Sequence, residues 1–437
     1  MTQESEKSTE PNVEQEIIRV TEKLLEEWVT DPAKGPVALH LKQKLLPVET
    51  IEGEGGIVYP PTYADIGYNI DTLSDGTQVA LIDSVGSQAN RLEPLFKAKF
   101  EHSSFENETE KKDWLVPPIE ITLHVEGNAK KEKKDKGDSA ETFQRETISL
   151  LDLAHRIADA VVHSSPTLFA ELENAFKTLK KTGDAGPLCA LAPTSLVFGV
   201  WDSRGGSNEK RPRLVRSVIR AWDVDVLHAA AQFNSVWKAL SPEQQEALEK
   251  EAKAKDKKLS AKGLHDAPAT FRKVSRKAAS MTEFRDGSPN PKRRILGGVL
   301  VHDRIEREVT VNLVALRGIC GKNEAETLAI RKYLLGLSLL AATADIDLFL
   351  REGCNLRYAD KDVWYAIPRR GDPKRICLND KDATSFVLDL AAYGRMHFKK
   401  MWPKSGGKDL PLQHDFSLAE AKKLLAKKED DTVEEEK

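Results

Sequence analysis

Hydrophobic and polar residues recur along the chain with two different periods. Alternation with a period of two predicts strands, whereas apolar residues spaced by three and four predict helices. The expected strands cover residues 36–48, 78–83, 119–125, 196–201, 213–226, 295–301, 308–317, 345–350 and 362–367. The expected helices lie within residues 13–29, 84–100, 148–164, 166–181, 227–262, 323–342, 382–401 and 416–426. Strands and helices do not alternate regularly, so the pattern favours an α+β fold over a doubly wound α/β fold.

The two ends and several internal segments lack this periodicity. Residues 1–12 are polar and acidic and are expected to be disordered, and residues 427–437 form an acidic tail. The stretch between them, 13–426, is interpreted as one core with insertions. Residues 49–69 are rich in Gly, Pro and Tyr, which predicts a long projecting loop. The highly charged residues 241–262 are interpreted as a helical surface insertion.

Composition narrows the class of protein. The chain has 437 residues and a net charge of −3, which argues against a uniformly basic binder but not against a local basic groove. Its four cysteines form no CxxC pair, so a zinc knuckle is not expected, and reduced cytosolic thiols are the simpler interpretation. The polar N-terminus does not resemble a signal peptide, and no apolar run approaches the roughly 20 residues of a membrane span. We therefore expect a soluble, cytoplasmic protein with no membrane partner.

Positive charge is concentrated in the predicted hairpin formed by the strands 196–201 and 213–226. Between Arg204 and Arg220 its cations are Arg204, Lys210, Arg211, Arg213, Arg216 and Arg220, against the single anion Glu209. Arginine forks suit phosphate, and the adjacent glycines allow close backbone approach. A nucleic-acid clamp and an ordinary solvated hairpin both fit these residues.

Two further segments add to the basic character. The first strand, 36–48, alternates apolar residues with His40, Lys42 and Lys44, and the loop 272–294 is rich in Arg and Lys and includes Arg293. The Lys-rich residues 128–138 are interpreted as a solvated loop. Candidates for stacking on bases are Tyr59, Tyr63, Tyr68 and Trp201, although tyrosines in such loops are also common packing residues.

Catalytic motifs are weak. The sequence contains no GxxxxGK[ST], HExxH or GxSxG pattern. The pairs Ser235 with Lys238, His302 with Asp303, and Asp345 with Asp347 match short motifs, but structural roles explain them better. We expect no catalytic residue, no metal site and no cofactor.

Three segments together resemble a known family. They are residues 80–96 (ALIDSVGSQANRLEPLF), residues 198–226 (FGVWDSRGGSNEKRPRLVRSVIRAWDVDV) and the loop that ends in YPPTY at 59–63. The chain resembles, over about residues 35–400, the backbone subunit of type I-U (also called I-G) CRISPR effector complexes. This subunit is the Cas-seven-type member of the RAMP superfamily.

The resemblance implies a ferredoxin-like, RRM-type antiparallel sheet core with large helical and loop insertions. It implies several copies along one CRISPR guide RNA in a Cascade-like antiviral interference complex, holding the sugar-phosphate backbone while the bases pair with target DNA. Other effector subunits and a recruited helicase-nuclease would be its partners, and this subunit would not be an enzyme. An alternative within the superfamily is an endoribonuclease that processes CRISPR precursor RNA.

The resemblance also implies which residues bind RNA. These are Ser87, Gln88, Asn90, Arg91, Arg204, Arg211, Arg213 and Arg216, with Lys42 and Arg293 as weaker candidates. A thumb that contacts the neighbouring copy would be residues 49–69 or 203–212, and the sequence does not decide between them. Asp83, Asn90 and Arg91 could equally form a structural network.

Overall fold

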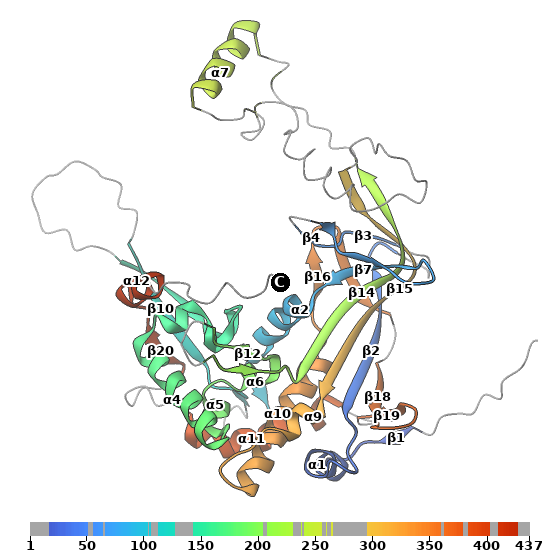
Figure 1. Cartoon of the computed structure of the whole chain (residues 1–437), viewed down its shortest axis with the longest axis vertical. Helices are drawn as coiled ribbons and strands as arrows, with labels where there is room; N and C mark the ends of the chain where they lie inside the picture. The colour runs from blue at the N-terminus through green and yellow to red at the C-terminus, as the bar shows by residue number, and fades with distance from the viewer. Residues whose placement is uncertain are drawn as a thin grey trace, which may run out of the picture.

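A large mixed sheet organises the chain. The computed structural model describes residues 17–50, 56–63, 66–103, 105, 112–126, 143–203, 208–229, 237, 240–255, 259, 264, 295–359, 362–378, 383–402 and 410–426. Within these residues the sheet has 11 strands, nearly all antiparallel (Figure 1). Its main path runs β1 (Ile18–Arg19), β19 (Lys374–Cys377), β18 (Val363–Ile367), β2 (Ala38–Pro47), β15 (Ile295–Asn312), β14 (Val215–Ala229), β7 (Gln78–Asp83) and β6 (Ile70–Thr72). Beside this path lie β3 (Ile57–Val58), β16 (Leu348–Arg351) and β17 (Cys354–Tyr358).

The register of the central strands separates a buried face from a polar face. Leu41 of β2 lies opposite Val309 of β15, which lies opposite Ser217 of β14, and all three are buried. One residue further along β2, Lys42 lies opposite Glu308. Because neighbouring residues of a strand point to opposite faces, charged side chains gather on the second face.

Two hydrophobic cores lie on the buried face. The larger core packs α10 (Glu324–Thr343) and α11 (Ala383–Phe398) against the sheet. The smaller core collects residues of β3, β7, β16 and β17, such as Val58 and Ile82. Strands β14 and β15 run through both cores, with Val215 in the larger and Ile219 in the smaller.

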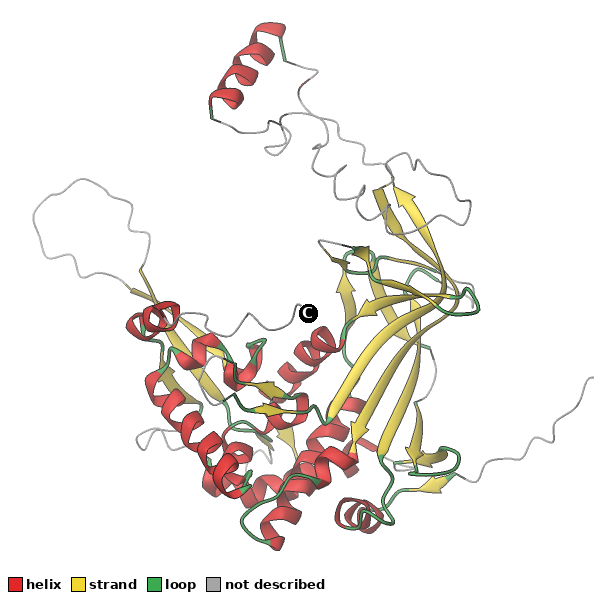
Figure 2. Cartoon of the chain, in the orientation of Figure 1, coloured by secondary structure: helices red, strands yellow, loops and turns green. Residues whose placement is uncertain are grey.

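A second, mainly helical part lies beside the sheet, with α2 (Val85–Leu92) between the two (Figure 2). Its helices are α3 (Ala160–His163), α4 (Pro166–Thr182), α5 (Gly186–Leu191), α6 (Pro193–Phe198) and α12 (Leu418–Ala426). A small sheet of β11 (Phe143–Ser149), β10 (Ile119–Glu126) and β20 (Leu412–Asp415) belongs to it. The two-stranded pairs are β12 (Val200–Trp201) with β13 (Lys210–Arg211), β4 (Thr62–Tyr63) with β5 (Gly67–Tyr68), and β8 (Phe100–Glu101) with β9 (Lys112–Asp113).

Three helices complete the described fold. Helix α1 (Glu22–Thr30) and α9 (Leu313–Arg317) pack near α10 at the lower end of the sheet. Helix α7 (Pro242–Ala254) begins with a capping box at Ser241, has no buried residue and stands apart from the sheet in Figure 1. It lies in the stretch predicted as a charged helical insertion.

The predicted α+β class is confirmed, as are the strand at Gln78–Asp83 and the helices α4 and α10. The predicted central hairpin, with strands over 196–201 and 213–226, is wrong. Residues 193–198 form helix α6, because Pro193 occupies its first turn and its apolar run is buried all round, which removes any telling periodicity. Gly199, at φ 81°, ends the helix. Strand β14 pairs with β15 and β7, whereas β12 pairs with β13.

The helix predicted over 148–164 is also wrong. Residues 143–149 continue as β11, and two 3₁₀ turns precede the short α3. Asp159 is extended and caps α3, and Arg156 has a φ of 55°, so a continuous helix is impossible. The predicted helix 13–29 starts only at Glu22, because Thr21 is its N-cap and Ile18–Arg19 joins the sheet.

The two strands predicted between 295 and 317 are one strand followed by α9. Strand β14 continues to Ala229, where a helix was predicted, and the helix predicted within 84–100 ends at Leu92. Residues 49–69 are more than a projecting loop, because Val58 and Tyr68 are buried in the smaller core. The predicted disordered N-terminus 1–12, the loops 128–138 and 272–294 and the tail 427–437 lie outside the described residues.

Candidate nucleic-acid interface

Helix α2 carries four of the predicted RNA-binding residues, and the structure divides them. Gln88 is fully buried: its amide donates to Asp83 Oδ2 at 2.6 Å, and its carbonyl oxygen accepts from Ser217 Oγ at 2.8 Å. Arg91 donates to Asp83 Oδ2 and to the Leu350 carbonyl. The structural network that the sequence left open for Asp83, Asn90 and Arg91 is thus present for Asp83 and Arg91, with Gln88 in it, while the RNA-binding assignments of Gln88 and Arg91 stay predictions. Asn90 is exposed and Ser87 is half-buried.

This network continues to the middle of the sheet through Arg307, which is fully buried. Its Nε donates to Gln88 and Ser217, and its Nη1 donates to Gln43 Oε1 at 2.6 Å. Burial lowers the pKa of Arg307, which bears one of the few charges between the two cores. A polar network of this kind fixes the register of β2, β14 and β15.

The open face of the sheet carries Lys42 and Arg216, as the alternation predicted. Arg216 is exposed on β14, and Lys42 lies two strands away on β2. Between them, β15 contributes Glu306, 3.6 Å from Lys42, and Glu308, 3.5 Å from Arg220. The sequence reasoning did not single out these two glutamates, and it left Glu306 in the gap between the predicted strands 295–301 and 308–317. The face is basic but partly neutralised.

The strongest concentration of cations surrounds a cavity of about 520 Å³ beside β12 and β13. Its charged and aromatic lining residues are His155, Arg156, Trp201, Lys210, Arg211 and Arg213. No acidic residue is among the described residues that line it. Two segments distant in sequence, 155–156 and 210–213, thus bring positive charge to one hollow, and two of the predicted residues, Arg211 and Arg213, are among them.

The cations of this cavity are not equivalent. Arg211 pairs with Glu209 at 2.6 Å and also borders a second cavity of about 300 Å³. His155 pairs with Asp159 at 3.2 Å. For Arg213 and Lys210, by contrast, no carboxylate of the described residues lies within ion-pair distance; the Nε of Arg213 donates to the Phe198 carbonyl at 2.9 Å.

Arg156 forms the floor of the cavity and was not predicted from sequence. It is buried, its Nε lies 2.7 Å from Glu93 Oε2, and its Nη2 has no hydrogen-bond partner within the described chain. Leaving a buried donor unpaired costs about 1–3 kcal/mol. Its left-handed backbone adds a further cost, which surrounding structure must offset. Such costs are typical of residues retained for binding.

Burial and like charge set the electrostatics of this floor. Burial, followed by the nearby Arg213 as a repulsive charge, lowers the pKa of Arg156, although Glu93 opposes the effect. Burial also raises the pKa of Glu93 to about 7, against the attraction of Arg156. Near neutral pH Glu93 is therefore only partly ionised and offsets less than one unit of the positive charge around the cavity.

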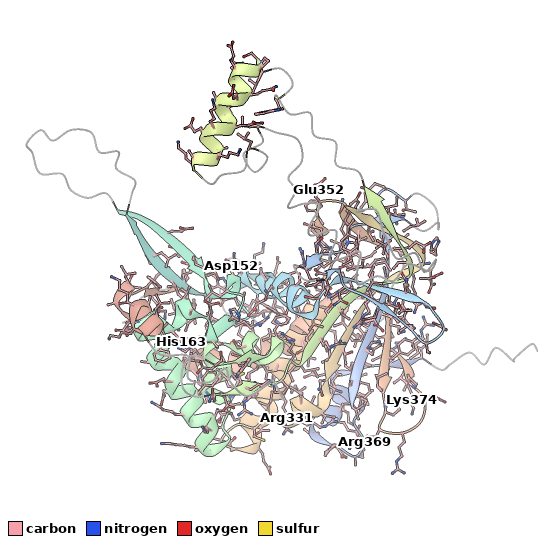
Figure 3. All side chains as sticks on the ribbon, turned by 45° about the horizontal axis from the view of Figure 1, so that its top comes forward. Asp152, His163, Arg331, Glu352, Arg369 and Lys374 are labelled. Atoms are coloured by element: carbon pink, nitrogen blue, oxygen red, sulfur yellow. The ribbon has the colours of Figure 1, made fainter. Side chains whose placement is uncertain are left out.

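A buried contact fixes one end of the turn between β12 and β13. Asp202 Oδ1 lies 3.1 Å from His163 Nε2, and both side chains are almost fully buried. The Asp202 amide donates to the Glu209 carbonyl. Figure 3 labels His163 within the helical part. Trp201, next to this anchor, is 61% exposed, whereas Tyr68 is buried and its hydroxyl accepts from the Gly298 amide.

Two predicted residues cannot be placed. Arg204 and Arg293 lie outside the described residues, as does part of the predicted thumb segments 49–69 and 203–212. The RNA-binding assignments of Ser87, Asn90, Arg211, Arg213, Arg216 and Lys42 stay predictions.

Comparison with known proteins adds one likeness to a family. Residues 39–226 match the sequence model of a family described as CRISPR-associated protein GSU0053. The matched range runs from β2 to β14 and includes the cavity, but it covers less than half of the chain. A search of curated proteins finds no match.

One solved structure similar to the chain is described as a CRISPR RNA-guided surveillance complex, pre-nicking. It is 11% identical, and the alignment covers 89% of this chain and 98% of that chain with a TM-score of 0.25. A TM-score of this size does not establish a shared fold.

Two searches within the described residues concern other kinds of site. They contain no group of three or more His, Cys, Asp or Glu side chains that could hold a metal ion. None of the helices in this part of the chain is long and apolar enough to cross a membrane.

Proposed function

We propose that the protein is a non-catalytic CRISPR RNA-binding subunit. Several copies would lie along one guide RNA, each holding the sugar-phosphate backbone and leaving the bases free to pair with target DNA. The observation that carries this proposal is the cavity beside β12 and β13, lined by cations from separate segments within the range that matches a CRISPR-associated family. Clustered cations are the electrostatic footprint of phosphate binding, and for Arg213 and Lys210 no carboxylate of the described residues lies within ion-pair distance.

The arrangement of the sheet supports an RRM-type core with insertions. Strands β18, β2, β15 and β14 are consecutive and antiparallel, with α2 and α10 on the buried side of the sheet and a charged face on the other. In this interpretation Lys42 and Arg216 of the open face, together with Arg213, contact the backbone. Other effector subunits and a recruited helicase-nuclease are its expected partners.

The test measures RNA binding as a function of salt. The full chain is titrated with a guide-length RNA, and Arg213→Gln and Arg216→Gln are compared with Lys374→Gln, an exposed residue on the far side of the molecule from His163 (Figure 3). Each of the first two variants should lower the slope of log K against log salt by about 0.7, equally for unrelated sequences. The control should bind like the wild type.

Two results would contradict the proposal. One is a loss of binding that depends on RNA sequence, since backbone contacts carry no sequence information. The other is metal-independent cleavage of repeat RNA by the purified chain, which would favour an endoribonuclease.

A further inference from the structure

We propose that the cavity beside β12 and β13 binds one nucleotide of the RNA as a unit, with its phosphate between Arg156 and Arg213 and its base stacked on Trp201. This inference rests on the proposed function, because it names the part of the RNA that the cavity takes. The inference also goes beyond the proposed function, because a subunit that only holds the RNA backbone needs no site for a base.

The phosphate position follows from two guanidinium groups that keep unused donors, although the Nε of Arg156 pairs with Glu93 at 2.7 Å. Arg156 lines the cavity, and its Nη2 is buried without a hydrogen-bond partner among the described residues. Arg213 lies close enough to Arg156 to lower its pKa. Two like charges beside one hollow without acidic lining repel each other until an anion lies between them. A phosphate diester supplies that charge and the acceptor oxygens that Nη2 lacks.

Backbone geometry aims Arg213 at this position. A Cβ on Gly199 would lie 2.6 Å from Arg213 Cγ, so only glycine lets the arginine stem cross here. The Arg213 Nε is used by the Phe198 carbonyl, which fixes the guanidinium plane and leaves its two terminal nitrogens for a ligand. The arginine is thus held in place before any ligand arrives.

The base position follows from Trp201 and its partner across the strand pair. Trp201 and Lys210 are directly opposite in the antiparallel register and therefore point to the same side. The ring is 61% exposed, and Lys210 Nζ lies 5.5 Å from its centroid. A base could stack on the open ring surface while the lysine remains close to its phosphate.

The same register assigns Arg211 to a different place. It lies opposite the buried Val200, so its side chain leaves on the other side of the strand pair from Trp201. There it pairs with Glu209 and borders the second cavity. Arg211 also lines the first cavity, so it lies at the border of the two cavities, and the proposal assigns the phosphate to Arg213 and Arg156.

The cavity volume also suits one nucleotide. About 520 Å³ lies within the roughly 300–1,000 Å³ typical of small-ligand sites. A duplex would not enter it, so the nucleotide must be single-stranded and unstacked.

The experiment uses the full chain and two dye-labelled probes in fluorescence anisotropy. One probe is a short oligouridine, and the other is an abasic ribose-phosphate oligomer of equal length. Trp201→Ala should weaken the oligouridine by between about 5-fold and about 150-fold, the equivalent of stacking one base, and leave the abasic probe within about 2-fold. Trp201→Phe should restore most of the loss. Because Trp201 is exposed, these variants should melt like the wild type.

The cations give the complementary result. Arg213→Gln should weaken both probes by a similar factor, whereas the remote Lys374→Gln should change neither by more than about 2-fold. Equal effects of Trp201→Ala on both probes, or no effect of Arg213→Gln, would overturn the nucleotide site.

Failure of this inference is distinguishable from failure of the proposed function. If Trp201→Ala leaves oligouridine binding intact while guide-length RNA still binds with a steep salt slope, the nucleotide site is wrong and the RNA-binding role stands. If the wild type binds neither probe nor guide-length RNA, both are wrong.

Discussion

Replacing Gln88 with alanine should unfold the protein more easily without weakening its contact with RNA. The Gln88 side chain makes hydrogen bonds to the Asp83 carboxylate and the Arg307 guanidinium, both of them buried charges. A hydrogen bond to a charged group contributes about 1.5–3 kcal/mol. In the variant, Asp83 still accepts hydrogen bonds from Arg91 and Arg351. Arg307 still donates to Ser217 and Gln43, so these remaining bonds offset part of the lost stability. We expect a decrease of about 3–5 kcal/mol in the free energy of unfolding.

Urea unfolding followed by circular dichroism measures this decrease. Asn90→Ala is the matched control, because Asn90 is exposed on the same helix and should change stability by less than about 0.5 kcal/mol. RNA affinity of Gln88→Ala, measured well below the urea midpoint, should equal that of the wild type. An unchanged midpoint combined with a clear loss of RNA affinity would refute the structural interpretation and return Gln88 to the RNA-binding set.

Three other perturbations have expected outcomes. Burial raises the pKa of Glu93 in the folded state to about 7. Relative to Glu93→Gln, the wild type should therefore be most stable below about pH 4.5 and should lose this advantage as the pH rises through about 7. Thermal melts across that range measure the difference, and an increase with pH would contradict the assignment. Gly394→Ala would place a Cβ against Tyr333 where α10 and α11 cross, so it should cost about 3 kcal/mol or more in chemical denaturation, whereas Gly86→Ala, with open space on α2, should stabilise by up to about 1 kcal/mol. Glu306→Gln frees Lys42 and Arg304 on the open face and should raise RNA affinity up to about 5-fold at low salt, an effect that disappears at high salt; an unchanged affinity would place the RNA elsewhere.

Local patterns correctly predicted several elements. The strand Gln78–Asp83 and the long, strongly apolar helix α10 both appear where the sequence placed them. Alternation along 36–48 correctly separated the buried Leu41 from the exposed Lys42.

The failures have a common physical cause, which is burial from several sides. Helix α6 is buried on every face, so no period distinguishes it from a strand. Arg307 is a charged residue in a core position. Because a charged residue is normally expected to be exposed, the sequence pattern interrupts the predicted strand at this position, whereas β15 continues through it. Its partners, such as Gln88 and Gln43, lie far away in sequence.

The candidate site was only half accessible to sequence reasoning. The cluster of arginines around 204–216 directed attention to the correct region, since Arg211 and Arg213 line the cavity. Arg156 could not be found in this way, because it lies in a segment predicted as helix and reaches the cavity only through a left-handed turn. The positive φ and the unpaired Nη2 are properties of the folded chain alone.

The two strands that run through both cores, β14 and β15, protect the sheet against a shift in strand register. A shift of β15 by one residue against β14 would turn Val309 and Ile305 to the polar face together, although each belongs to a different core. The same shift would separate Arg307 from Ser217. One register shift thus causes three separate losses of stability. Repacking either core alone therefore cannot stabilise the shifted sheet.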